Sequence, residues 1–126
     1  MSTIPAELKY TKSHEWVREE DGVWTVGLTD FAQDSLGDIV YVNLPEAGDP
    51  VTAGESFADV ESVKAVSDVF SPVTGTVSEV NEELLDDPAR INGAPYEAWL
   101  IRVTGVTGTE DLLDAAGYEA ACAAEE

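Results

Sequence analysis

Residues 59–75 read DVESVKAVSDVFSPVTG, and the pattern of this stretch indicates a β-hairpin. Two runs of β-forming residues, Ser56–Val63 and Val66–Phe70, stand on either side of Lys64. We expect these runs to pair as a hairpin with Lys64 at its tip. Lys64 is the only lysine between Ser13 and the end of the chain. A lysine presented at an exposed tip by two strands is suited to covalent modification by another enzyme; the alternative is an ordinary solvated turn lysine.

Short β runs separated by glycine and proline turns continue on both sides of this hairpin. Thr29 is expected to cap a short helix over Asp30–Leu36 that ends at Gly37, and Thr109 is expected to cap a helical segment over residues 109–126. The other strands are expected in a hairpin over residues 14–28 that turns at Glu20-Asp21-Gly22, and at residues 39–44, 76–80 and 99–103. Residues 81–92 are expected to form a polar loop with one helical turn at Leu84 and Leu85. This pattern predicts a mainly β sandwich or barrel with helices at its ends.

The composition limits the number of domains and the kinds of partner. The 126 residues fit one domain over residues 1–126, with a β core over residues 23–104. There are 26 acidic and 6 basic residues, which gives a formal net charge of −20. This charge argues against nucleic-acid binding and against docking on anionic membranes, because both need a basic surface. We expect the protein to be a monomer and its high net charge to keep it soluble.

The sequence carries no signal for export or membrane insertion. Residues 1–12 lack the apolar run of a signal peptide. The longest stretch without a charge is residues 69–78, far shorter than the ~20 apolar residues of a membrane span. We expect a cytoplasmic protein; a mature mitochondrial protein would have the same features.

Residue types that carry catalysis or bind metals are scarce. His14 is the only histidine and Cys122 the only cysteine, so the chain lacks a set of zinc ligands and cannot form an internal disulfide. The G-x-S-x-G motif of serine hydrolases is absent. We therefore expect no metal site and no independent enzyme activity.

Several segments, in order and with similar spacings, resemble the glycine cleavage system H-protein family. They are residues 59–75, YTKSHEWV at 10–17, VGLT at 26–29, LGD at 36–38, LPE at 44–46, IN at 91–92 and PY at 95–96. The resemblance runs from about Leu8 to Tyr118. It implies a flattened lipoyl/biotinyl-type β-barrel, a barrel-sandwich hybrid, with short helices near residues 30–36 and at the C-terminus.

The resemblance also implies a prosthetic group and partners. Lys64 would carry lipoate as N6-lipoyllysine. The flanks of the attachment motif are Glu61, Ser62, Val63 and Ala65. The arm would carry the aminomethyl group of glycine from a pyridoxal-phosphate glycine decarboxylase (P protein) to a tetrahydrofolate-dependent aminomethyltransferase (T protein). Dihydrolipoamide dehydrogenase (L protein) would reoxidise it, and lipoate-attaching enzymes would be further partners.

The family has a surface cleft that holds the cationic aminomethyl group, and the matching residues here are Ser13, Glu15 and Asp68. The alternative is that both acids are ordinary solvated side chains among 26. Two other positions depart from the family pattern. Glu97-Ala98 forms a shorter turn, and Phe31 stands where bacterial relatives often have histidine.

Other kinds of carrier protein, and a protein that carries no prosthetic group, are the alternatives to this interpretation. Val63 and Ala65 beside Lys64 favour lipoate over biotin, because biotinyl domains usually have methionine at both positions. Val63 also argues against a lipoyl domain of a 2-oxo acid dehydrogenase, which usually has aspartate there. Two further interpretations are an H-like protein that relays lipoyl groups to other enzymes and an acidic β-sandwich interaction module without lipoate.

Overall fold

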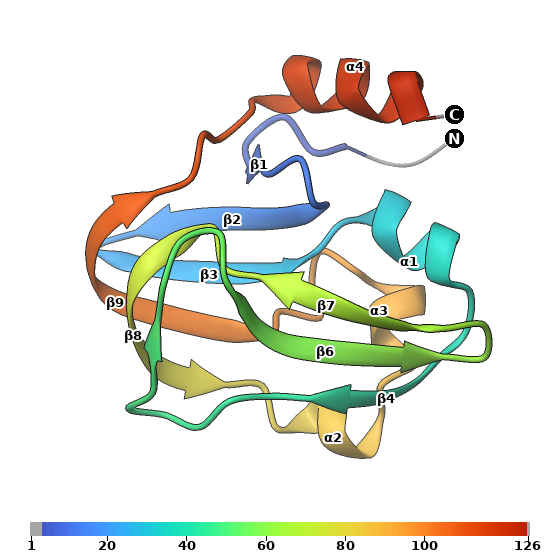
Figure 1. Ribbon diagram of the computed structural model, residues 1–126, viewed down its shortest axis with the longest axis horizontal. Coiled ribbons are helices and arrows are strands. Elements are labelled where there is room, and N and C mark those ends of the chain that lie inside the picture. Colours follow the sequence, from blue (N-terminus) through green and yellow to red (C-terminus); the bar gives the residue numbers. More distant parts are fainter. Residues whose placement is uncertain (1–3, 126) are drawn as a thin grey trace.

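The computed structural model describes residues 4–125, which form two facing β-sheets with helices at their margins (Figure 1). The larger sheet has the strand order β1-β2-β3-β9-β8-β5 and the smaller one the order β4-β6-β7. The expected mainly β, barrel-sandwich architecture is thereby confirmed. The elements are β1 (Lys9–Tyr10), β2 (Glu15–Glu20), β3 (Val23–Leu28), α1 (Asp30–Leu36), β4 (Ile39–Asn43), β5 (Pro50–Val51), β6 (Ser56–Ser62), β7 (Val66–Phe70), β8 (Val73–Val80), α2 (Glu83–Asp86), α3 (Arg90–Gly93), β9 (Ile101–Thr109) and α4 (Ala115–Glu125).

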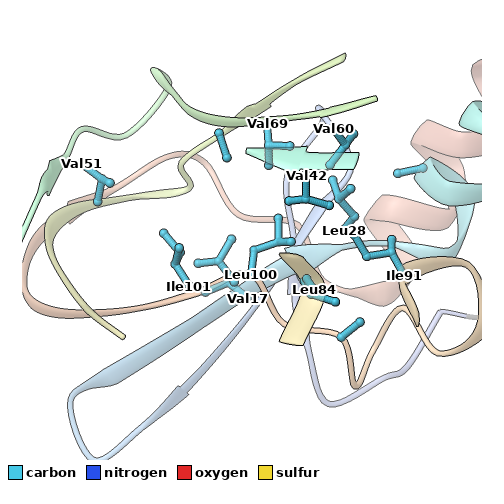
Figure 2. Packing of buried hydrophobic residues seen from close by; sticks show 14 of the residues in the cluster. Val17, Leu28, Val42, Val51, Val60, Val69, Leu84, Ile91, Leu100 and Ile101 are labelled. Atoms are coloured by element: carbon cyan, nitrogen blue, oxygen red, sulfur yellow. The ribbon is translucent and has the colours of Figure 1, made fainter. Parts of the chain in front are cut away.

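The main hydrophobic core fills the space between the two sheets. Val42, Val60 and Val69 of the smaller sheet lie above Leu100 and Ile101 in Figure 2, and all five side chains are fully buried. Burial of a side chain of this size contributes roughly 1.5–3 kcal/mol. This packing holds the β6–β7 hairpin against the larger sheet and leaves its other face to the surface.

Local sequence signals set the turns in the first third of the chain. Asp21 and Gly22 form the β2–β3 turn with φ values of 51° and 82°, as a two-residue hairpin turn requires. Thr29 caps α1, because its Oγ1 accepts a hydrogen bond from the Ala32 N–H at 3.2 Å. Gly37 ends α1 with a φ of 78°. The predicted hairpin and first helix are confirmed.

The expected boundaries near the C-terminus are wrong. β9 extends to Thr109, which pairs with Val73, and the N–H of Glu110 donates to the carbonyl of Pro72 at 2.7 Å. Thr109 is therefore not a helix cap, and the helical segment expected from this residue onward begins at Ala115. The cause is that the sheet uses the backbone groups that a helix start would leave free.

Three other ranges also need correction. The strand expected at residues 76–80 begins at Val73. The helical turn expected at Leu84 and Leu85 is confirmed as α2, but the loop expected over residues 81–92 also contains the start of α3 at Arg90. The β core extends beyond residues 23–104, because β2 pairs with β3 along its whole length and β1 pairs with β2.

A second, smaller core lies beneath α4, which runs above β1 and β2 in Figure 1. The rings of Tyr10 and Tyr118 stack there with their centroids 4.7 Å apart. The cluster consists of Leu8, Tyr10, Trp16, Tyr118 and Cys122. Within residues 4–125, no helix is long and apolar enough to cross a bilayer.

Candidate functional site

The tip of the β6–β7 hairpin is a tight turn built by Ser62. The Ser62 N–H donates to the Ala65 carbonyl at 2.8 Å, and Ser62 Oγ accepts from the N–H groups of Lys64 and Ala65, both at 3.1 Å. These bonds leave Val63 and Lys64 exposed at the two corners of the turn. The predicted hairpin with Lys64 at its tip is confirmed.

We call residues 62–65 the attachment turn, because Lys64 is the residue expected to carry lipoate. This turn contacts the segment that joins α1 to β4 (Figure 1). The Val63 N–H donates to the Asp38 carbonyl at 3.0 Å. The Lys64 side chain passes over Gly37, so that a Cβ added to Gly37 would lie 3.3 Å from Lys64 Cε. Gly37 therefore serves both the positive φ at the end of α1 and the space beneath the lysine. The ion pairs found among residues 4–125 do not include Lys64.

Exposed apolar side chains surround the attachment turn. Val63, Val66 and Tyr41 are 67%, 64% and 46% exposed. Tyr41, Glu61 and Val66 lie opposite one another in the strand register, so they share the outer face of the smaller sheet. The surface next to Lys64 is therefore apolar with one carboxylate, Glu61, inside it.

Glu15, the first residue of β2, is buried and only 1% exposed. Its Oε1 accepts hydrogen bonds from Thr11 Oγ1 at 2.6 Å and from Ser13 Oγ at 2.5 Å. Its Oε2 accepts from the Phe70 N–H at 3.3 Å, which links β2 to the last residue of β7. Glu15 is thus not one of the solvated acids.

Burial raises the pKa of Glu15 to about 7. The carboxylate has lost its water, and the hydrogen bonds from Ser13, Thr11 and Phe70 offset only part of that cost. Glu15 is therefore partly protonated near neutral pH, and a nearby cation would favour its ionised form. Carboxyl groups perturbed in this way are often found at functional sites.

Glu15 lines a cleft of about 340 Å³ that is formed by three separate segments. The lining residues are Thr11, Lys12, Ser13, Glu15, Phe70, Ser71, Glu110 and Asp111. Sequence reasoning missed Glu110 and Asp111, because the segment after Thr109 was expected to form a helix. Three carboxylates and one lysine give the cleft a net negative charge, which suits a cationic group.

Asp68 does not line this cleft. It is exposed on β7, two residues before Phe70, and so lies on the same face of that strand. Of the three residues expected to form the cleft, the structure brings Ser13 and Glu15 together. It places Asp68 on the strand between Lys64 and the cleft.

His14 shapes the turn that carries the cleft residues. Its φ of 72° is left-handed, and its Nδ1 lies 2.7 Å from Tyr118 Oη, which lies 2.6 Å from Thr29 Oγ1. The His14 ring stacks on Phe31 with the centroids 4.6 Å apart. The departure from the family at position 31 therefore affects the packing of His14.

Known proteins that are similar to this chain share one description. The glycine cleavage H-protein family matches residues 8–125. A glycine cleavage system H protein of Lachnoclostridium phytofermentans is 62% identical over 113 residues, which is 89% of each chain. One from Marinomonas sp. is 58% identical over 127 residues, covering 98% of this chain and 100% of its own. The crystal structure of a glycine cleavage system H protein from Mycobacterium marinum aligns with a TM-score of 0.88 and 44% identity, covering 93% of this chain and 97% of that one. With the fold, the lysine turn and these relatives in agreement, the chain belongs to the glycine cleavage H-protein family.

Proposed function

We propose that this chain is the lipoyl carrier of the glycine cleavage system and that Lys64 is the residue that carries lipoate. Family membership supports the carrier role. The observation that carries the assignment to Lys64 is its exposed position in a turn whose backbone is fixed on both sides. In this role the chain is a cytoplasmic substrate of other enzymes and not itself a catalyst.

Mass spectrometry of the chain from lipoate-replete cells tests the assignment. Peptide mapping should place an increment of roughly 188 Da, lipoic acid less one water, on Lys64. An unmodified Lys64 would contradict the carrier proposal, and a biotinyl increment of roughly 226 Da would instead indicate a carboxylase carrier.

The surroundings of Lys64 fit a lipoyl group in amide linkage. Lys64 is exposed, and the absence of a side chain at Gly37 leaves room for its stem. Acylation of Nζ removes one positive charge, so the formal net charge changes from −20 to −21. When bound, the lipoyl group supplies a disulfide that accepts the aminomethyl group of glycine and is regenerated by oxidation of the dithiol.

The cleft around Glu15 is within reach of such an arm. β7 rises about 13 Å from Val66 to Phe70 at the usual spacing of strand residues. A lipoyl-lysine side chain has about fourteen bonds from Cα to the terminal sulfur and spans roughly 18 Å when extended. The path runs along β7, and Asp68 lies on it. We therefore assign the cleft to the cationic amine of the cargo, with Glu15 as its counter-ion, Ser13 as hydrogen-bond partner and Asp68 at the approach.

Retention of this cargo should depend on the charge of Glu15. In Glu15→Gln the ammonium group loses its buried counter-ion, so we expect the loaded carrier to release ammonia about tenfold faster after the decarboxylase is removed. The wild-type rate should itself rise as the pH falls and Glu15 becomes protonated, and this rise should begin below pH 7 because the bound cation favours the ionised carboxylate. Glu97→Gln, which removes an exposed acid outside the cleft, is the matched control. Equal release rates from the two variants would argue against the cleft assignment.

Ser62 should control how well the attachment turn is presented. Ser62→Ala removes the Oγ bonds to the Lys64 and Ala65 N–H groups. Both N–H groups are exposed, so the variant should lose only about 1 kcal/mol of stability. The initial rate of enzymatic lipoylation should fall roughly fivefold because the lysine is less well oriented. Ser67→Ala on the same hairpin serves as the control, and equal lipoylation rates in both variants would contradict this role.

The partners in this proposal are the P, T and L proteins and the lipoate-attaching enzymes. A carrier that meets several enzymes in turn needs fast and weak encounters. A net charge of −20 steers such encounters toward basic surfaces, and salt weakens that attraction.

A further inference from the structure

We propose that Asn92 is a positioning residue for lipoylation: its carboxamide fixes the corner, residues 37–39, against which the attachment turn docks. This inference rests on the proposed role of Lys64. Asn92 lies in α3, far from Lys64 in the sequence, and has no hydrogen bond to the attachment turn.

The Asn92 side chain holds both sides of Asp38. Its Oδ1 accepts a hydrogen bond from the Ile39 N–H at 2.8 Å, and its Nδ2 donates to the Gly37 carbonyl at 2.8 Å. The second Nδ2 hydrogen is used by Gln33 Oε1 at 3.0 Å, which ties α1 into the same network. One planar amide therefore fixes the two peptide groups that flank Asp38.

The corner that Asn92 holds is the one that the attachment turn contacts. The Asp38 carbonyl accepts a hydrogen bond at 3.0 Å from the N–H of Val63, the residue immediately before Lys64. Gly37 lies beneath the Lys64 stem. Ser62 lies opposite Ile39 in the β4–β6 register, so the turn joins the barrel where this strand pair ends. The bond from Val63 to Asp38 is the link nearest to Lys64, and it extends this pairing to the corner that Asn92 holds.

Few side chains could replace this amide. Aspartate keeps the acceptor for the Ile39 N–H but has no hydrogens to donate to the Gly37 carbonyl. Alanine removes all of the bonds. In either case the corner can move, and the acceptor nitrogen of Lys64 then spends less time where the lipoylating enzyme needs it. Misplacement of a reacting group by about 1 Å can cost as much as 100-fold in rate.

Amide hydrogen exchange in the folded protein separates positioning from a general loss of stability. In Asn92→Ala the Val63 amide should exchange about tenfold faster. The Ser62 amide bonds within the turn to Ala65 and should keep its protection, so it serves as an internal reference. Asn43→Ala is the matched control, because Asn43 pairs with Asp59 on the same sheet and does not contact the corner.

The second readout is the initial rate of lipoylation with lipoate, ATP and a lipoate-attaching enzyme. We expect kcat/KM for Asn92→Ala to fall about fivefold while the final incorporation at Lys64 remains complete. Asn92→Asp keeps the size of the side chain and the Ile39 bond, so it preserves the fold in case alanine does not. It should show the same selective exposure of the Val63 amide.

The two proposals fail in different ways. Wild-type exchange at Val63 together with a wild-type lipoylation rate in a folded Asn92 variant would overturn the positioning role and leave Lys64 as the attachment site. Incorporation of lipoate into Lys64→Arg would overturn the proposed function. Equal acceleration of the Val63 and Ser62 amides would also overturn the positioning role, because it would show loss of the hairpin as a whole.

Discussion

Replacing Lys64 by arginine is expected to abolish both lipoylation and glycine cleavage. Arginine keeps the positive charge and much of the stem, but its guanidinium is not acylated under these conditions. The turn should survive, because its hydrogen bonds come from the backbone and from Ser62. Intact-mass measurement after incubation with lipoate, ATP and the attaching enzyme should show no increment, and the reconstituted system should form no ammonia from glycine.

Lys9→Arg is the matched control for this experiment. Lys9 is an exposed lysine of β1, so its replacement should leave the increment of roughly 188 Da and the activity unchanged. Glycine cleavage by Lys64→Arg at the wild-type rate would reject the carrier function. It would favour the acidic interaction module that carries no lipoate.

Glu15 should make the protein less stable as the pH rises through neutrality. The pKa of Glu15 is raised from 4.5 to about 7 in the folded chain, so the folded state binds the proton more tightly than the unfolded state does. The resulting stability is complete below about pH 4.5 and is lost as the pH rises through about 7. The difference corresponds to about 3 kcal/mol. In Glu15→Gln this contribution is absent.

Denaturant unfolding between pH 4.5 and pH 8 measures this effect. The free energy of unfolding of Glu15→Gln, relative to that of the wild type, should rise by about 3 kcal/mol across this range. The comparison cancels the repulsion among the other acids, which both proteins share. Glu97→Gln should stay parallel to the wild type. A constant difference between Glu15→Gln and the wild type would show that Glu15 has an ordinary pKa.

The sequence also predicted the main local features correctly, because neighbouring residues encode them. Asp21 and Gly22 adopt the positive φ values of a hairpin turn, and Thr29 and Gly37 mark the two ends of α1. The predicted start of the C-terminal helical segment at Thr109 is wrong, because Thr109 pairs with Val73 in the sheet despite a local helix signal. The backbone groups of a potential helix cap can also form sheet hydrogen bonds, and here they pair with a strand that is distant in the sequence.

The hairpin that presents Lys64 could be predicted from the sequence alone, because two adjacent β-forming runs stand on either side of the lysine. That Ser62 closes the turn is seen only in the structure. The surroundings of the lysine depend on the tertiary structure. The cleft joins residues 11–15, 70–71 and 110–111, and the corner under the turn is held by Asn92. Burial and hydrogen bonding between such distant segments depend on how the sheets pack, so they cannot be predicted from a local sequence pattern.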